Sequence, residues 1–332
     1  MYEGTTNAGT TTEANAVEYL STTFNTTYSW TYEMVRLELH KLYEKAKRDQ
    51  WDGATLLPWH LDVDPEAELL PDMQIPVYGT HLWDRATQRE RLKLRRESLR
   101  WLLSNFMHGE QGALLATAQI VDCTPSMEAK FYGATQVMDE ARHVEVFARY
   151  LTEKLGGPYA ISPHLKQLLD QILTDSRWDV KYLGMQILVE GLAMAAFGFM
   201  HKTCNEPLLT DLLHNVIRDE SRHVAFGVIA LDDFFRTLSD KERREREEFV
   251  FEGCRLMRDR LLAEEVWREM GWPVDETRDI VLHSPVMIEF RKMLFSKVVP
   301  NVKRLGLLSP WLRERFEQDL DILKFEHEEP SA

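Results

Sequence analysis

The sequence predicts an all-α protein whose centre is a four-helix bundle. From about residue 84 onward, apolar residues recur at the three- and four-residue spacing of helices, and almost no stretch alternates as a strand does. Residues that favour helix starts and ends lie between these stretches. The phrases DEARHV (139–144) and DESRHV (219–224) also repeat eighty residues apart, which indicates two similar helical halves.

The composition excludes several classes of protein. The chain has 332 residues and a net charge of −14, which argues against nucleic acid as the main partner. No basic region followed by an apolar segment opens the chain, and the longest apolar stretch, 191–200, is too short to span a membrane. Cys123, Cys204 and Cys254 lack CxxC spacing, so we expect neither a disulfide framework nor a thiolate metal site, and we expect a cytoplasmic location.

The elements follow in order along the chain. Residues 1–30, rich in Thr, Asn and Ala, are expected to form a loose arm, and a helix is expected from Met34 to Trp51, before a Pro- and Asp-rich irregular segment. Further helices are expected near 84–121, 125–155, 163–174, 177–203, 207–236, 240–270, 276–298 and 309–325. Thr124-Pro125, Ser162-Pro163 and Ser239 suit helix starts, and Gly156-Gly157 suits a helix end.

No break in composition divides the chain, so residues 31–332 are expected to form one domain. Its core is expected at about 84–236, with accessory helices at about 31–55 and 240–325.

Each repeated phrase places a carboxylate and an imidazole on one helical face. Glu140 and His143 are three residues apart, and so are Glu220 and His223. The same offset of eighty maps Glu110 onto Glu190, so each half reads as a lone glutamate followed thirty residues later by Glu-x-x-His. Because both legs of a helical hairpin rise about 1.5 Å per residue, a turn midway brings the two glutamates of each half to one height.

Two such hairpins, packed about a pseudo-twofold axis, would gather four carboxylates and two imidazoles around one point. That is the ligand set of a dinuclear iron or manganese site. The oxygen and nitrogen ligands suit these ions, and the lack of thiolates argues against structural zinc or iron–sulfur clusters. Any one of these residues could be an ordinary salt-bridge partner, but their joint spacing favours metal. The predicted ligands are Glu110, Glu140, His143, Glu190, Glu220 and His223.

Neighbouring residues suggest supporting roles. Asp139 and Asp219 precede ligand glutamates, and each is expected to accept the free ring N–H of the opposite hairpin's histidine. Arg142 and Arg222 would balance these aspartates, and a plain interhelical salt bridge is the alternative. Three glycines beside the ligands would leave room for oxygen or substrate, or permit close helix contact: Gly109, Gly112 and Gly191.

Two charged runs lie outside this constellation. A basic stripe recurs at helical spacing through Arg85, Arg89, Lys93, Arg96 and Arg100, and it reads as solvated surface or as a docking strip for an acidic reductase or carrier protein. The run KERREREE (241–248) reads as a solvated helix face.

The motif Glu110…Glu140-Ala-Arg-His143…Glu190…Glu220-Ser-Arg-His223 resembles the ferritin-like di-iron carboxylate superfamily over about residues 100–235. Its spacing is most similar to that of acyl-carrier-protein desaturases, ribonucleotide reductase small subunits and their relatives, and aminobenzoate N-oxygenases. The resemblance implies two iron ions, or a Mn/Fe pair, that use O2 and an external electron donor such as a reductase or ferredoxin. The substrate would be a small or carrier-bound organic molecule that is hydroxylated, N-oxygenated or desaturated. A homodimer is one possible oligomeric state.

The chain departs from each relative at one position or more. Phe147 stands where reductase subunits carry a radical tyrosine, and Ala113 and Met185 cannot form the Val–Tyr cross-link of the ligand-binding oxidases. Val216 replaces an additional histidine ligand of the N-oxygenases, and Ala193 and Met194 stand where desaturases carry a threonine. A ferroxidase or iron-storage protein, and a ligand-binding oxidase or scaffold without turnover, therefore remain alternatives.

Overall fold

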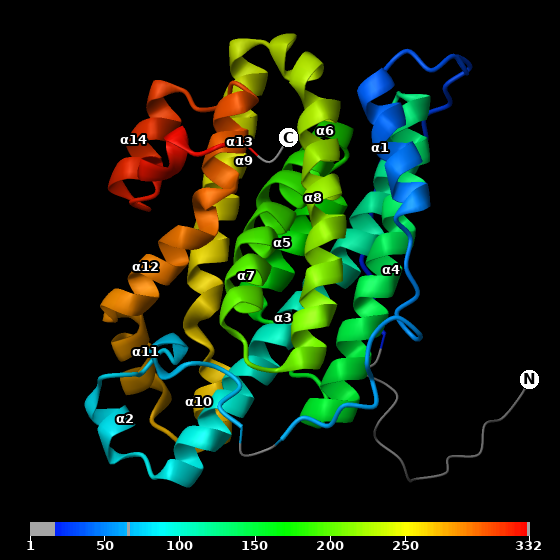
Figure 1. The fold of residues 1–332 in the computed structure, drawn as a ribbon. Helices are drawn as coiled ribbons and strands as arrows, with labels where there is room; N and C mark the ends of the chain where they lie inside the picture. Colours follow the sequence, from blue (N-terminus) through cyan, green and yellow to red (C-terminus); the bar gives the residue numbers. More distant parts are fainter. Residues whose placement is uncertain (1–16, 65–66, 331–332) are drawn as a thin grey trace, which may run out of the picture.

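The computed structural model describes residues 17–64 and 67–330, and four long helical segments form its centre (Figure 1). Helix α3 (Gln88–Cys123) and helix α4 (Met127–Leu155) make one antiparallel hairpin. The second hairpin pairs α8 (Pro207–Arg236) with a composite helix. That helix joins α6 (Trp178–Tyr182), the π-helical segment η2 (Leu183–Val189) and α7 (Glu190–Thr203). The protein is thus an all-α, ferritin-like four-helix bundle with flanking helices, and no strand occurs within the described ranges.

Capping residues set the ends of the central helices. The Thr87 side chain and Glu90 form a capping box that begins α3, and Ser126 accepts the N–H of Ala129 to begin α4. Thr124 is therefore not the cap predicted for this start; it follows α3 as its C-terminal cap. Gly156, with φ of +84°, ends α4 in the left-handed conformation that glycine adopts without strain, as the sequence predicted.

Flanking helices cover the bundle on two sides. Helix α1 (Leu37–Arg48) packs on α4 and α8, while α5 (Pro163–Thr174) packs between α3 and α9 (Asp240–Asp259) (Figure 1). Ser162 and Ser239 begin α5 and α9, as expected. The short helices η1 (Asp72–Gln74) and α2 (His81–Arg85) lie in the connection before α3.

The C-terminal region is more broken than the sequence predicted. The expected helix 240–270 divides into α9, the 3-10 turn η3 (Arg260–Leu262) and α10 (Glu264–Met270), because Ala263 adopts a positive φ of 50°. The expected helix 276–298 divides at Ser284, since the residue before Pro285 disfavours helical geometry. The remaining elements are α11 (Val274–His283), α12 (Pro285–Met293), η4 (Leu294–Ser296), α13 (Val298–Arg304), α14 (Pro310–Gln318) and η5 (Leu323–His327).

The expected arm falls partly outside the described residues, since 1–16 are not among them. From residue 17 to the start of α1 the chain has no regular structure, although the N–H of Thr27 donates to the carbonyl of Asp122 at 3.0 Å. Glu128 of α4 accepts the N–H groups of Val35 and Arg36, at 2.6 and 2.9 Å, and so holds the chain where α1 begins.

Among the described residues, one helical run is long and apolar enough to cross a membrane by length and composition, Trp178–Thr203. Of its most apolar window, 78% is buried inside the protein. The run is the composite helix, so its apolar character is explained by packing in the bundle centre.

Both charged runs make contacts that the sequence did not predict. In the basic stripe, Arg85, Arg89 and Lys93 are exposed, as expected of solvated surface. Arg96 donates to the carbonyl of Lys154 at 2.9 Å, Arg100 donates to that of Gly157, and Lys93 pairs with Glu269, so these three residues also fasten α3 to the end of α4 and to α10. In the run 241–248, Arg246 is buried in an ion pair with Asp179 at 2.9 Å, which corrects the expectation of a wholly solvated face.

Candidate metal centre

The six predicted ligand side chains meet at one buried place between the hairpins. Glu110 comes from α3, Glu140 and His143 from α4, Glu190 from the first position of α7, and Glu220 and His223 from α8. All six are buried, and both histidines are fully so. Their donor atoms form two overlapping groups, each with atoms within 4.8 Å of one another. One group is Glu110, Glu140, His143 and Glu220, and the other is Glu140, Glu190 and His223.

The distances describe a compact cluster of oxygen and nitrogen donors. His143 Nδ1 lies 3.1 Å from a Glu220 oxygen and 3.3 Å from a Glu110 oxygen. His223 Nδ1 lies 3.0 Å from a Glu140 oxygen, and the two imidazole centroids are 5.9 Å apart. Glu140 belongs to both groups, so its carboxylate would contribute to holding both ions.

Unpartnered atoms in the cluster support a cation as the missing partner. Within the described chain, no hydrogen bond reaches Glu140 Oε2, Glu190 Oε2, either oxygen of Glu220 or His223 Nδ1. Leaving a buried polar atom without a partner costs roughly 1–3 kcal/mol, and more when it is charged. The donor set contains no sulfur and suits iron or manganese. The residues present therefore fit two such ions.

In the metal-free cluster, the pKa shifts of four residues favour their protonated forms. Burial, followed by repulsion from Glu140 and Glu220, raises the pKa of Glu190 well above its usual value, and burial with repulsion from Glu220 does the same for Glu110. Burial alone would lower the pKa of His143, but its hydrogen bonds with Asp219 and Glu110 and the nearby carboxylates of Glu140 and Glu220 raise it well above its usual value. The pKa of His223 is raised in the same direction, through Glu140 and Glu220.

The aspartates that precede the ligand glutamates reach across the bundle to the opposite histidines. Asp219 Oδ2 lies 3.3 Å from His143 Nε2, and Asp139 Oδ2 lies 3.3 Å from His223 Nε2. Each aspartate thereby orients a histidine so that Nδ1 faces the cluster.

Arg222 donates to Asp139 and Asp219 at 3.1 and 2.7 Å. Arg142 also donates to both, at 3.0 Å to Asp219. The same four residues therefore make the interhelical salt bridges and orient the histidines, so the two predicted roles occur together in one network.

Three residues that the sequence reasoning missed donate hydrogen bonds to these aspartates or to the ligand glutamates. Trp51 Nε1 donates to Asp219 at 2.7 Å, and Gln50 Nε2 donates to Asp139 at 2.9 Å, from just beyond α1. No periodic pattern marks these two positions. Gln136 Nε2 donates to Glu140 at 3.0 Å and to Glu190 at 2.8 Å. Because Gln136 is four residues before Glu140, the same helical-face rule would have found it.

The π-helical segment places Glu190. Residues 183–189 are π-helical where the sequence predicted a regular helix, and Glu190 follows directly. Such segments frequently mark functional sites. Gly227 of α8 permits the close approach, since a Cβ there would lie 2.5 Å from the Cβ of Gln186.

The glycines beside the ligands divide between the two predicted roles. A Cβ on Gly112 would lie 2.5 Å from Leu169 of α5, and one on Gly191 would lie 3.2 Å from Val298 of α13, so both permit close helix packing. A Cβ on Gly109 would meet nothing within 4 Å, and Gly109 lines a small cavity of about 20 Å³. This cavity also touches Glu110, Glu190 and Glu220.

Comparisons with known proteins show which family the chain matches. It matches the family described as p-aminobenzoate N-oxygenase AurF over residues 34–306. No curated protein matches it. One similar solved structure is a mutant R2-like ligand-binding oxidase with an anaerobically reconstituted Mn/Fe cofactor, with 19% identity, coverage of 78% of this chain and 94% of that chain, and a TM-score of 0.49.

A second mutant of the R2-like ligand-binding oxidase, with the same kind of cofactor, is 20% identical to this chain. The match covers 83% of this chain and 95% of that chain, with a TM-score of 0.48. The family match extends over most of the chain and contains all six cluster residues. The chain therefore belongs to the AurF family of p-aminobenzoate N-oxygenases, and it is an O2-dependent oxidoreductase of the ferritin-like di-iron type.

Proposed function

We propose that this protein is a dinuclear-iron N-oxygenase that oxidises the amino group of a small aromatic amine. The buried cluster with its unpartnered carboxylate oxygens carries the proposal, because it offers four carboxylates and two imidazoles to two ions. The family match, whose described activity is N-oxygenation of p-aminobenzoate, favours this reaction over hydroxylation or desaturation.

The six cluster residues would hold the ions: Glu110, Glu140, His143, Glu190, Glu220 and His223. Iron in both positions is the main assignment, and a Mn/Fe pair is the alternative, since the donor set suits both. When bound, the ions supply O2 activation and the redox step. Asp139 and Asp219 hold the imidazoles in orientation, with Arg142 and Arg222 balancing their charge.

The small cavity is suited to keep this chemistry dry. Phe106, Ala113 and Phe197 line it together with the carboxylates, and all three are buried. Apolar walls of this kind exclude water and strengthen the electrostatic interactions of the site.

The proposed reaction requires an electron donor as a partner. Continued turnover would require an external electron donor, such as a reductase or ferredoxin. A cytoplasmic location is consistent with three buried, unbridged cysteines, Cys123, Cys204 and Cys254.

Anaerobic Fe(II) titration of metal-free protein tests the site first. We expect two irons per chain, and then a transient visible band on exposure to O2. Glu140→Ala should lose at least one iron because Glu140 belongs to both donor groups. Glu145→Ala is the matched control, since Glu145 is an exposed carboxylate on the same helix. One iron or none in the wild type, or two in Glu140→Ala, would contradict the proposal.

Turnover of 4-aminobenzoate with O2 and a chemical reductant tests the reaction itself. Mass spectrometry should detect hydroxylamine or nitro products. Iron oxidation without any organic product, across a panel of aromatic amines, would favour a ferroxidase instead.

A further inference from the structure

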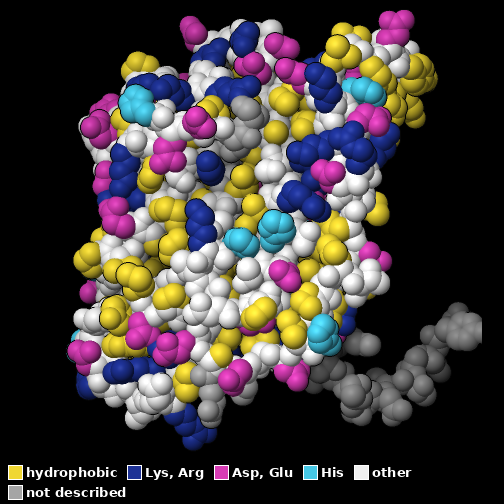
Figure 2. All heavy atoms as spheres, in the orientation of Figure 1, with side chains coloured by type: hydrophobic (Ala, Val, Ile, Leu, Met, Phe, Trp, Pro, Cys, Tyr) yellow, Lys and Arg dark blue, Asp and Glu magenta, His cyan; other side chains and the backbone are white. Residues whose placement is uncertain are grey.

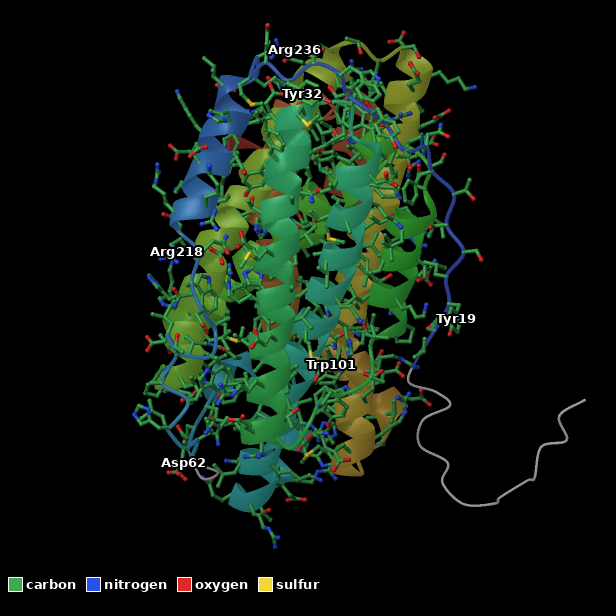
Figure 3. The ribbon with its side chains drawn as sticks, turned by 90° about the vertical axis from the view of Figure 1, so that its right-hand side faces the viewer. Tyr19, Tyr32, Asp62, Trp101, Arg218 and Arg236 are labelled. Carbon is green, nitrogen blue, oxygen red and sulfur yellow. The ribbon has the colours of Figure 1, made fainter. Side chains whose placement is uncertain are left out.

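A cavity of about 400 Å³ lies between the bundle and the elements that flank it. Its wall is built by the segment around η1, by α3 and α7, by η3 and by α12. Figure 3 shows Trp101, which lines the cavity from α3, in the lower half of the bundle. This volume is within the range of roughly 300–1,000 Å³ that is usual for small-molecule sites.

Side chains separate this larger cavity from the metal centre. It shares no lining residue with the small cavity beside the glutamates. Phe106 and Phe197, which line only the small cavity, pack edge to face with ring centroids 4.6 Å apart. The buried Arg260 also lines only the small cavity, while its neighbour Leu261 lines the larger one. The larger cavity is therefore a site of its own.

Most of the lining is apolar and adaptable. The aromatic side chains of Trp101, Phe199 and Phe290 belong to it. The N–H of Trp101 donates to Glu265 at 2.9 Å, so the indole offers the cavity its apolar ring. Methionine is unbranched and polarizable, and it adjusts to apolar partners of different shapes. Four of the chain's 13 methionines line the cavity: Met73, Met200, Met287 and Met293.

The lining offers no free charge to a ligand. Among the described residues that line the cavity, Glu289 is the only ionisable one. Its two oxygens already pair with Lys292 at 3.1 Å and with Lys324 at 2.9 Å. An anion or a cation would therefore enter without a partner, and an ion that is buried and unpaired is strongly unfavourable. The cavity favours a neutral occupant.

Two neutral polar side chains in the lining are available to a ligand, Gln74 and Ser98. Both are half-buried, and neither makes a side-chain hydrogen bond with any residue in the described ranges. The hydroxyl and the amide can each donate and accept. A small number of polar groups in an apolar lining is the usual means by which a small-molecule site fixes the orientation of its ligand.

We propose that the larger cavity binds a neutral, largely apolar small molecule whose single hydroxyl or carbonyl group hydrogen-bonds to Gln74 or Ser98. Because the site is distinct from the metal centre, this inference does not depend on the proposed function. The outer lining is accessible from solvent, since Met73 and Val286 are 62% and 46% exposed. Figure 2 shows hydrophobic side chains gathered over the region of α11 and α12, on the left of the view.

Displacement of a neutral fluorescent dye tests the class of ligand. Protein loaded with Fe(II) and kept anaerobic would be titrated with Nile red, and the bound dye would then be displaced with 1-octanol or with octanoate near neutral pH. The two competitors share one alkyl chain, and only octanoate is charged. We expect one dye per chain, and 1-octanol should displace it at a concentration roughly 10-fold lower than octanoate does.

Removal of the two polar side chains tests the hydrogen bond. In the double variant Gln74→Leu/Ser98→Ala, affinity for 1-octanol should fall roughly 3- to 10-fold, because the hydroxyl loses its partners. The matched ligand is 1-chlorooctane, which has no hydroxyl and should bind the wild type and the double variant alike.

Single substitutions test the location of the site. Val286→Asp places a charge in the lining and should lower the affinity for Nile red at least about 5-fold. Leu282→Asp is the matched control, because Leu282 is 39% exposed, lies four residues earlier and does not line the cavity. Ala196→Leu adds a larger side chain to the buried wall on α7, so it should also lower the affinity. Thermal melts would show that each variant folds.

Four outcomes would each overturn the proposal. They are absence of dye binding by the wild type, equal displacement by octanoate and 1-octanol, unchanged affinity for 1-octanol in Gln74→Leu/Ser98→Ala, and unchanged dye affinity in Val286→Asp. Light scattering on the same samples tests the alternative occupant, a second copy of this chain. A wild-type dimer that Val286→Asp dissociates, and Leu282→Asp does not, would identify the cavity as an interface and overturn the proposal as well.

The iron content of these samples is a separate readout. Fewer than two irons per chain would contradict the proposed function, whereas two irons without any preference for the neutral ligand would reject only the site in the larger cavity.

Discussion

The protonation of the metal cluster changes with metal binding, and this change can be measured at the scale of single residues. In the metal-free protein, the pKa values of His143 and His223 are raised, which favours the protonated form of both imidazoles. The pKa values of Glu110 and Glu190 are raised as well, so these carboxyls also retain protons more than usual. Metal ions require the deprotonated forms.

Metal uptake should therefore release protons, and the apparent affinity for Fe(II) should rise with pH. A group whose pKa is raised keeps its proton up to a higher pH. That proton competes with the metal ion for the same atom, and the competition weakens as the pH increases from about 6 to about 8. Anaerobic titrations in weakly buffered solution with a pH indicator would measure the release. An affinity that is independent of pH would show that the histidines are neutral before metal binds.

Asp219 is a second residue whose role can be separated from that of the ligands. It accepts from His143, Trp51, Arg142 and Arg222, so Asp219→Asn should weaken metal binding roughly 10- to 100-fold by releasing the orientation of His143. The control is Asp211→Asn, because Asp211 is exposed on the same helix. Equal iron affinity in both variants would assign Asp219 to salt bridging alone.

Some residues of the site were predictable from the sequence and others were not, for a geometric reason. Helical spacing determines which side chains share a face, so the offset of eighty was enough to select all six cluster residues and the two aspartates. Gln50 and Trp51 extend from an irregular segment, where no period relates sequence position to direction.

At the scale of elements, close contact between α3 and α5 depends on Gly112. A methyl group there would lie 2.5 Å from the Cδ2 of Leu169, so Gly112→Ala should destabilise the protein by about 1–3 kcal/mol and lower its melting temperature. Gly109→Ala, one turn earlier, meets nothing within 4 Å and should be neutral or stabilising by up to about 1 kcal/mol. Equal melting temperatures of the two variants would mean that Leu169 moves aside without cost.

Helix boundaries show the same division between what could and could not be predicted. The sequence located α5, α8 and the end of α4, because Ser162, Pro207 and Gly156 have local chemistry that begins or ends a helix. It did not reveal the π-helical segment 183–189, whose Gln186 packs closely against Gly227 of α8.

At the scale of the whole molecule, the flanking helices distinguish this protein from an iron-storage shell. Helices α9 to α14 cover one side of the bundle, and α1 covers another (Figure 1). We expect a mass of one or two chains by size exclusion with light scattering, with a homodimer as the larger state. A shell of many chains would contradict the oxygenase proposal and support storage.

The repeat that organises the bundle is not exact, and its two halves give the metal positions different surroundings. Gln136 donates to two carboxylates of the second donor group, Glu140 and Glu190, while the position eighty residues later is Val216. The second half also carries the π-helical segment, and the first half has a regular helix in its place. Two iron nuclei bound here would consequently be distinguishable, and Mössbauer spectra of the fully loaded ferrous protein should contain two quadrupole doublets of equal area.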